Sequence, residues 1–170
     1  MYFENQFIKL VALDISHLDI VHNWINNEII NESSGTRFPI SKENQKNWIL
    51  KTIQNKSKKK LIILNNENLE VGMVSIMNID YRNRNAELGV YLDPDHVRKG
   101  YASMALSMLI DFGFQELNMH KLYAFIHADN KNSIRLFEKL NFSLESKHID
   151  EIYKKGKFFA NLKYSLFKEN

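Results

Sequence analysis

The chain has 170 residues, of which 44% are apolar and 25% are charged, and its formal net charge is +3. This composition is typical of a folded globular domain and excludes a mostly disordered chain, while so small a net charge does not by itself indicate nucleic-acid binding. The absence of cysteine excludes disulfides, thiolate metal sites and a cysteine nucleophile.

The first residues, MYFENQFIKLVALD, alternate apolar and polar side chains and carry an acid early. They lack the basic segment and apolar run of a signal peptide, and no stretch of the chain approaches the roughly 18 apolar residues of a membrane span. We therefore expect a single cytoplasmic domain over residues 1–170 that has neither a membrane nor a nucleic acid as its partner.

Hydrophobic periodicity predicts the elements in the first half of the chain. They are a strand over 6–13, a helix over 17–27, a loop over 31–40, a helix capped by Ser41, and a hairpin of strands 60–64 and 69–79. In the helix after Ser41, we place Trp48, Ile49 and Ile53 on the inner face. The lysine run over 56–60 is interpreted as a solvated surface.

The second half continues the alternation of strands and helices. A strand over 86–92, a helix from about residue 101, a strand over 121–128, a helix over 131–140 and strands over 143–153 and 157–167 follow in turn. The complete order is β-α-α-β-β-β-α-β-α-β-β, which predicts an α/β fold with a central mixed sheet flanked by helices. The β-α-β unit over 86–128 requires parallel strands, and ligands of such sheets bind where the strands end.

The stretch DHVRKGYASMALSMLIDFG, residues 95–113, lies at that place. Its basic, glycine-containing turn leads directly into a helix with Ala102, Ala105, Leu106, Leu109 and Phe112 on one face. One interpretation is a helix start with surface cations. The other is an anion site, because the first amides of a helix lack internal partners and carry the positive end of its dipole.

Three segments together resemble the GNAT acetyltransferases, namely AELGVYLDPDHVRKGYA, LNMHKLYAFIHADN and NSIRLFEKLNF. Within this superfamily the chain most resembles the branch that contains spermidine, ribosomal-protein alanine and amino-sugar acetyltransferases. The segments HNWINNE and PISKENQKNW also resemble that branch. This resemblance implies the GNAT fold and transfer of an acetyl group from acetyl-CoA to a primary amine, by direct attack and with no metal.

The resemblance also implies a set of coenzyme-binding positions. The family's Gln/Arg-x-x-Gly-x-Gly/Ala phosphate loop corresponds to residues 97–102, where Val97 departs from the pattern and Gly100 and Ala102 match it. The backbone at Tyr91 is expected to donate to the thioester oxygen, and Asn130 to contact pantetheine, cap a helix, or do both. The implied set is Val90, Tyr91, Leu92, Val97, Arg98, Lys99, Gly100, Tyr101, Ala102, Ser103, Asn130, Asn132 and Phe137.

Glu87 is the candidate catalytic base, because it stands among apolar residues three positions before the pantetheine segment. A carboxylate raised in pKa by burial can accept the ammonium proton of an amine acceptor. The alternatives are a solvent-facing Glu87 or one paired with Arg82 or Arg84.

Many relatives place a tyrosine acid where this chain has Phe137, and a glycine where it has Asn141. A phenyl ring donates no proton. The thiolate therefore leaves unprotonated or through water, another group such as Tyr91, Tyr101 or Tyr123 substitutes, or the protein binds acyl-CoA without turnover. Phe137 thus motivates the main alternative function, a noncatalytic acyl-CoA-binding or regulatory module, beside RNA or ribosome binding through the basic surface.

The acceptor is expected to be a small-molecule or peptide amine: a polyamine, a protein N-terminus or an amino sugar. Trp24, Trp48 and Phe38 are interpreted as core residues or as walls of the acceptor pocket, and Glu28, Glu32 and Glu43 would favour a cationic acceptor. The six histidines show no metal-ligand spacing; His96 is a candidate CoA contact, whereas His120 and His127 are interpreted as packing residues. A homodimer is a further expectation from the resemblance.

Overall fold

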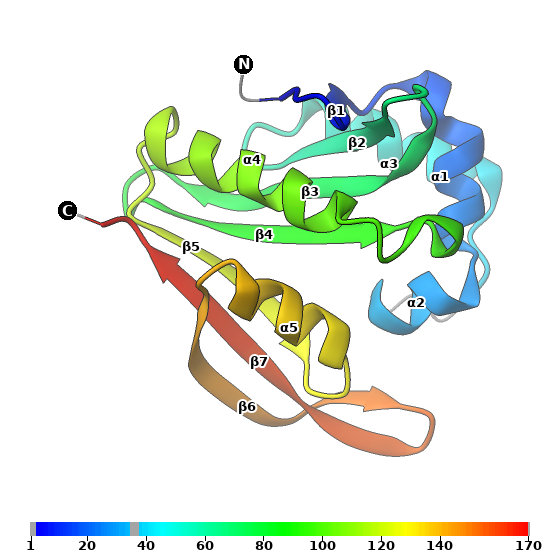
Figure 1. The fold of residues 1–170 in the computed structure, drawn as a ribbon. Coiled ribbons are helices and arrows are strands. Elements are labelled where there is room, and N and C mark those ends of the chain that lie inside the picture. Colours follow the sequence, from blue (N-terminus) through cyan, green and yellow to red (C-terminus); the bar gives the residue numbers. More distant parts are fainter. Residues whose placement is uncertain (1–2, 35–37, 170) are drawn as a thin grey trace.

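The computed structural model of the chain describes residues 3–34 and 38–169, with no side-chain description for 32–34. A mixed sheet of seven strands runs through it in the order β1-β2-β3-β4-β5-β7-β6 (Figure 1). The strands are β1 (Ile8–Ala12), β2 (Lys59–Asn65), β3 (Glu70–Asp80), β4 (Asn85–Leu92), β5 (Lys121–His127), β6 (Ser143–Lys154) and β7 (Lys157–Phe167). The α-helices are α1 (Leu18–Ile25), α2 (Glu28–Ser34), α3 (Lys42–Gln54), α4 (Tyr101–Gln115) and α5 (Lys131–Lys139).

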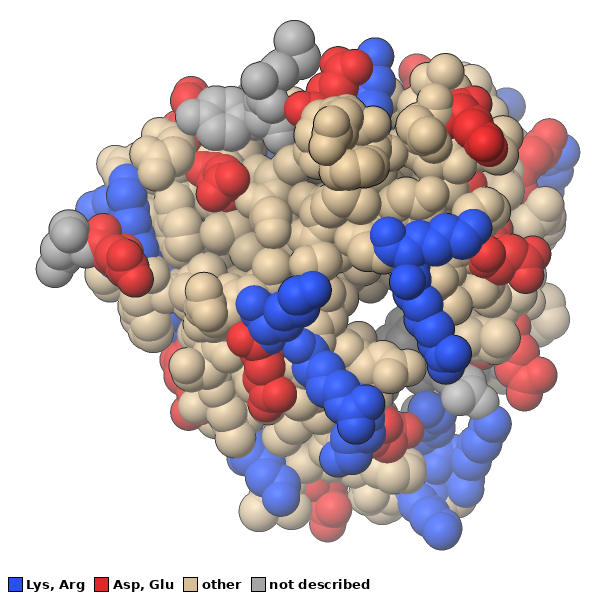
Figure 2. Space-filling view, viewed as in Figure 1, with Lys and Arg blue, Asp and Glu red and all other residues tan. Residues whose placement is uncertain are grey.

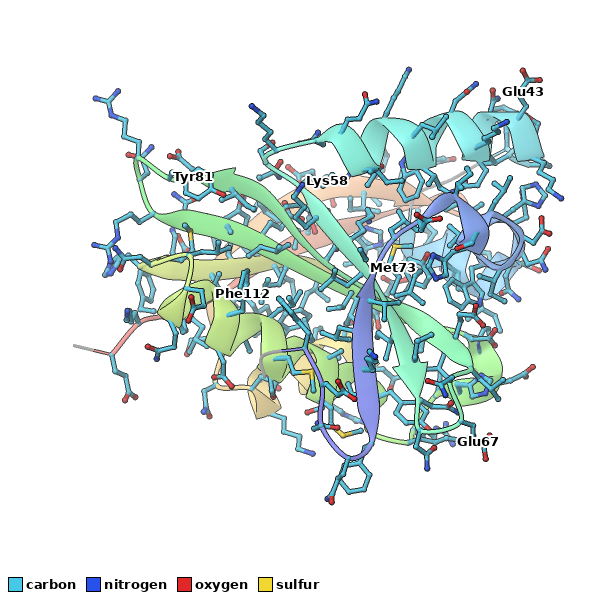
Figure 3. All side chains as sticks on the ribbon, turned by 90° about the horizontal axis from the view of Figure 1, so that it is seen from above. Glu43, Lys58, Glu67, Met73, Tyr81 and Phe112 are labelled. Atoms are coloured by element: carbon cyan, nitrogen blue, oxygen red, sulfur yellow. The ribbon has the colours of Figure 1, made fainter. Side chains whose placement is uncertain are left out.

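Helices cover both faces of the sheet. Leu106 of α4 and Phe137 of α5 are buried against β-strand residues such as Leu88, whereas Trp24 of α1 and Ile49 of α3 belong to a second apolar cluster. Viewed from above, α3 and α4 lie on opposite sides of the sheet (Figure 3). Each strand therefore alternates side chains between two apolar layers, as the period of two requires.

The only parallel neighbours among the described strands are β4 and β5, and they pair over only three residues, Asn85–Glu87 with Lys121–Tyr123. Beyond that point the two strands diverge, as Figure 1 shows. The β5-facing backbone edge of β4 from Leu88 to Leu92 consequently has no strand partner. This opening at the carboxyl ends of the strands is where the β-α-β pattern predicts a ligand.

The predicted mixed α/β fold is confirmed, but the predicted helix count before the hairpin is wrong. Three α-helices separate β1 and β2 instead of two, because α2 occupies part of the segment expected to be a loop. This seven-residue helix has the sequence EIINESS, and its Ile30 is buried. A sequence so short and polar has no apolar stripe from which the helix could have been predicted. Residues 35–37 of the expected loop lie outside the described residues.

Two packing predictions in the same region also need correction. Phe38, for which a core position was one interpretation, is 80% exposed and borders an outer hollow. On α3 the buried positions are Gln45, Ile49 and Thr52, whereas Ile53 is exposed. Two polar side chains therefore take inward positions, and apolar periodicity could not detect this arrangement.

No helix among residues 3–34 and 38–169 is long and apolar enough to cross a membrane.

Candidate active site

Two adjoining hollows lie where β4 and β5 diverge. The outer cleft, of about 860 Å³, is bounded by the end of β4, the loop before α4 and the start of α5. The inner cavity, of about 680 Å³, lies among α1, α3 and strands β2 to β5. Val90, Tyr91, His127, Asn130 and Ser133 line both, so the two hollows share a wall.

The loop into α4 exposes backbone amides to the outer cleft. Arg98 has a φ of 64° and Gly100 a φ of 83°, both in the left-handed region. Gly100 is the N-cap of α4 and makes no side-chain cap hydrogen bond, whereas Ser41 and Asn130 cap α3 and α5 with their side chains. The N-cap residue therefore supplies no acceptor to the first amides of α4, and the positive end of the helix dipole at this terminus favours an anion.

Positive charge gathers around this cleft. Arg98, Lys139 and Lys154 line it, and Figure 2 shows Lys and Arg side chains on both sides of a hollow in this face. Of the predicted coenzyme-binding residues, Val90, Tyr91, Leu92, Val97, Arg98, Gly100, Ala102, Ser103, Asn130 and Asn132 line the cleft. Lys99 is exposed outside it, and Tyr101 packs against the core.

Close packing of β3 against β4 fixes the backbone at Tyr91. A Cβ atom added to Gly72 would lie 2.4 Å from the Tyr91 carbonyl oxygen, a distance that real Cβ contacts do not reach. Glycine at this position is therefore needed for β4 to run beside β3. The opposite edge of β4 is left free to meet an extended ligand, as an unpaired strand edge can.

The start of α5 lies between the two hollows. The Asn130 side chain accepts a hydrogen bond from the Ser133 amide at 3.1 Å, which confirms the helix-cap role expected for it. Phe137 lies on the same helix, is buried, lines the inner cavity and packs edge-to-face on Phe142 with ring centroids 5.1 Å apart. The position of the missing tyrosine acid is therefore at the wall of the cavity and carries no proton donor.

Glu87 lines the inner cavity and is half-buried. Its Oε2 accepts a hydrogen bond from Asn78 Nδ2 at 2.8 Å. The pairing with Arg84 considered as an alternative does not occur, because Arg84 donates to the backbone oxygen and side chain of Asn118. The carboxylate thus faces the cavity with an amide as its hydrogen-bond partner.

The three tyrosines considered as acids lie in different surroundings. The Tyr91 hydroxyl lies 3.6 Å from Met73 Sδ, and burial raises the pKa of Tyr91. Burial, together with the charge of Glu87, also raises the pKa of Tyr123. Tyr101 lines neither hollow.

The expectation that residues 56–60 form a solvated surface is wrong for Lys60, and Lys58 also lines the inner cavity. Lys60 is half-buried, and burial, with a smaller effect of Lys58, lowers the pKa of Lys60 to about 8. The alternation of side chains along a strand could have predicted this placement, because residues 58 and 60 share a face with Ile62 if β2 is extended by one residue. The run of lysines instead led to the interpretation of the whole segment as a solvated surface.

Of the three histidines considered in the sequence analysis, only His127 lines the two hollows. His127 lines both hollows, and burial lowers its pKa; its interpretation as a packing residue missed this place. His96 lines neither hollow and lies 3.9 Å from Asp93, while His120 is exposed and contacts Phe167. Among the described residues, no group of three or more His, Asp or Glu side chains could hold a metal.

Of the acidic residues expected to favour a cationic acceptor, Glu28 and Glu43 do not line the inner cavity. Glu28 is exposed and borders a further hollow, which shares Ile40 and His127 with the inner cavity. Glu43 lies at the N-terminal end of α3, whereas Lys58 lies immediately before β2 (Figure 3). The Glu32 side chain lies outside the described residues.

Comparisons with known proteins agree with this geometry. Residues 8–143 match the model of the acetyltransferase (GNAT) domain. The chain is 25% identical over 154 residues to spermidine N(1)-acetyltransferase of Vibrio cholerae, covering 91% of this chain and 89% of that one.

The similarity extends to solved structures. The crystal structure of spermidine N-acetyltransferase from Vibrio cholerae in complex with CoA and spermine superposes with a TM-score of 0.90 at 24% identity, covering 96% of each chain. A dodecameric structure of the same relative in an intermediate state gives a TM-score of 0.83 at 24% identity, covering 96% of this chain and 95% of that one.

The comparisons give no support to the alternative of a noncatalytic acyl-CoA-binding module. The divergent β4–β5 pair, the amide-rich loop before α4 and the family match over residues 8–143 have one common explanation. This chain belongs to the GNAT family and is an N-acetyltransferase that uses acetyl-CoA.

Proposed function

We propose that the chain moves the acetyl group of acetyl-CoA, bound in the outer cleft, to the primary amine of a small molecule bound in the inner cavity. The observation that carries this proposal is the wall shared by the two hollows at Val90, Tyr91 and Asn130. A thioester at this wall can meet an amine that enters from the opposite side.

The loop before α4 is proposed to hold the pyrophosphate. Its amides supply hydrogen-bond donors, its dipole favours an anion by about 0.3–1 kcal/mol, and Arg98 adds charge from the same wall. The absence of a polar side chain at Val97 removes one contact of the family pattern but leaves every amide in place.

The pantetheine arm is proposed to lie along the unpaired edge of β4. Residues Val90–Leu92 have no β5 partner, so their backbone groups can bind an extended amide-containing chain. Asn130 contributes from the other side through its Nδ2 group, because its Oδ1 caps α5. The pantetheine arm would thus be contacted from both sides of the cleft, by the β4 edge and by Asn130.

Glu87 is proposed to act as the general base. It accepts the ammonium proton of the acceptor, directly or through water, and the neutral nitrogen then attacks the thioester carbon. A backbone amide near Tyr91 donates to the oxyanion, a contribution of about 2.7–4 kcal/mol in comparable sites. The attacking nitrogen then loses its second proton to water, the C–S bond breaks, the amide product forms, and the electron pair leaves with the CoA sulfur.

No protein acid is assigned to the departing thiolate. Phe137 carries no proton, and the Tyr91 hydroxyl is directed at Met73. A thiol has a reference pKa near 8.5, so the thiolate can leave unprotonated or take its proton from water.

Polyamines, peptide N-termini and amino sugars remain the acceptor classes to compare, and the relatives named for spermidine make it the first to test. Residues 1–170 are proposed to form one catalytic domain without a metal, acting in the cytoplasm. A homodimer is proposed as its smallest assembly.

The test is release of CoA from acetyl-CoA with spermidine, amino-terminal peptides and amino sugars as acceptors. Thermal stabilisation by acetyl-CoA is measured in parallel. Acceptor-dependent release is the expected result. Stabilisation without release by any amine would contradict catalysis and favour a binding role.

A further inference from the structure

The inner cavity contains two lysines that the chemistry described so far does not use. We propose that Lys58 and Lys60 form an anion-binding subsite, so that the acceptor is a primary amine that also carries a phosphate or carboxylate group. This inference rests on the proposed acetyl transfer and narrows its substrate.

Strand register places this subsite beside the reacting centre. Lys60 pairs with Ser75 across β2–β3, and Ser75 pairs with Gly89 across β3–β4. Two strand spacings, roughly 10 Å, therefore separate the Lys60 and Gly89 backbones. Gly89 follows Glu87 by two residues and faces the same cavity, so an acceptor a few bonds long can reach both the lysines and the carboxylate.

The two ammonium groups lack the partners that other lysines have. No hydrogen bond or ion pair joins the ammonium group of Lys58 or Lys60 to a residue within 3–34 or 38–169; both groups instead approach the Trp48 ring, with Nζ 6.0 and 5.4 Å from its centroid. By contrast, Lys121 and Lys154 form ion pairs with Glu145 and Asp129.

Such an arrangement is unfavourable without a ligand. Desolvation disfavours the charged form of Lys60, and Lys58 adds a like charge beside it, while the charge of Glu87 acts in the opposite direction with a smaller effect. The stabilisation from Trp48 is modest because cation–π contacts contribute only about 0.5–2 kcal/mol. An anion between the two ammonium groups would offset both the desolvation of Lys60 and its repulsion by Lys58. Charged groups in such unfavourable surroundings are common at binding sites.

The remaining charges of the cavity agree with this assignment. Glu87 is the one carboxylate among the described residues that line it, against two lysines. Glu87 is proposed to receive the amine, which leaves the lysines to receive an opposite charge elsewhere on the same molecule. A polyamine would instead bring further positive charge toward Lys58 and Lys60, which is repulsive.

The experiment compares acceptors that differ only in one anionic group. The pairs are glucosamine 6-phosphate with glucosamine, and 4-aminobutyrate with 4-aminobutanamide, with spermidine alongside; kcat/KM is measured for each. Binding of both members of each pair to the CoA-loaded protein is also measured by calorimetry, which reports on the subsite without turnover. The proteins are the wild type, Lys58→Gln/Lys60→Gln, and the control Lys59→Gln, whose exposed lysine lies between the two.

We expect at least one anionic member to exceed its uncharged partner and spermidine at least tenfold in kcat/KM, and to bind more tightly than that partner. Both preferences should disappear in Lys58→Gln/Lys60→Gln and remain in Lys59→Gln. A phosphate-pair preference and a carboxylate-pair preference distinguish the two anion types.

The outcomes separate this inference from the proposed function. Acetylation in which spermidine or the uncharged members are preferred, or in which the double variant keeps the preference, overturns the anion subsite and leaves acetyl transfer intact. If no amine is acetylated, the proposed function fails, and calorimetry alone then decides the subsite: equal binding within both pairs overturns it.

Discussion

The outer cleft and the inner cavity share a wall but are built from different parts of the chain. The outer cleft takes much of its wall from backbone, namely the edge of β4 and the loop before α4, and Arg98, Lys139 and Lys154 add positive charge around it. The inner cavity is made of side chains such as Trp48, Lys60 and Glu87, which come from three separate elements. Backbone binds a ligand part common to many enzymes, whereas side chains set what is particular to this one.

This difference predicts how variants should separate. Changes to the inner cavity should alter turnover or acceptor choice and leave acetyl-CoA affinity unchanged. Changes to the loop before α4 should alter acetyl-CoA affinity first.

The largest effect is expected for Glu87→Gln. Loss of the general base should lower kcat by about 100-fold or more, while the Kd for acetyl-CoA stays within twofold. Steady-state kinetics and calorimetry provide the two values. Asp80→Asn, at the last residue of β3, is the matched control and should be near wild type; equal turnover in both variants would remove Glu87 from the mechanism.

The next effect concerns the outer cleft. Gly100→Val should weaken acetyl-CoA binding at least tenfold, because a β-branched residue is strained at a φ of 83°. The nearest atom to an added Cβ, Met104 Cε, is 3.8 Å away, so strain and not collision is the cause. Gly100→Asn tests this reasoning, since Asn tolerates the left-handed region and should retain most of the affinity; equally weak binding in both would contradict it.

A smaller change is expected from Phe137→Tyr. The new hydroxyl stands at the position of the family's acid, so kcat should rise by up to about tenfold. Phe137→Leu keeps an apolar side chain and should not raise kcat. An unchanged rate in Phe137→Tyr would show that thiolate departure does not limit turnover.

The smallest effect concerns stability. Lys60→Met should raise the free energy of unfolding by about 1 kcal/mol at pH 7, because it removes a desolvated ammonium. The pKa of Lys60 is lowered from 10.5 to about 8, so the unfolded state binds more protons between these values and the wild type gains stability as pH rises through this window. The advantage of Lys60→Met should therefore shrink toward pH 10. Urea unfolding at both pH values measures it, and a constant difference would contradict the desolvation of Lys60.

The contrast between the two hollows also explains what the sequence could predict. Residues 86–102 form one continuous segment whose pattern places a strand, a loop and a helix start in order, so Gly100 and the β4 edge could be identified without coordinates. Trp48 and Lys60 are brought beside Glu87 by packing between segments far apart in the chain. No local pattern records that proximity.

Polar and short elements were the other source of error. α2 has too few apolar residues for periodicity to detect, and the inner face of α3 includes Gln45 and Thr52. The interpretation of Phe38 as a core residue was wrong for a related reason, because aromatic character alone does not reveal that a side chain is 80% exposed.

The central prediction from the wall shared by the two hollows is that coenzyme and acceptor are bound at the same time. Initial-velocity kinetics with both substrates varied, together with intact mass of the protein after incubation with acetyl-CoA alone, test it most directly. We predict intersecting reciprocal plots and no acetylated protein. Parallel plots with an acetyl group on the protein would contradict direct transfer across the wall.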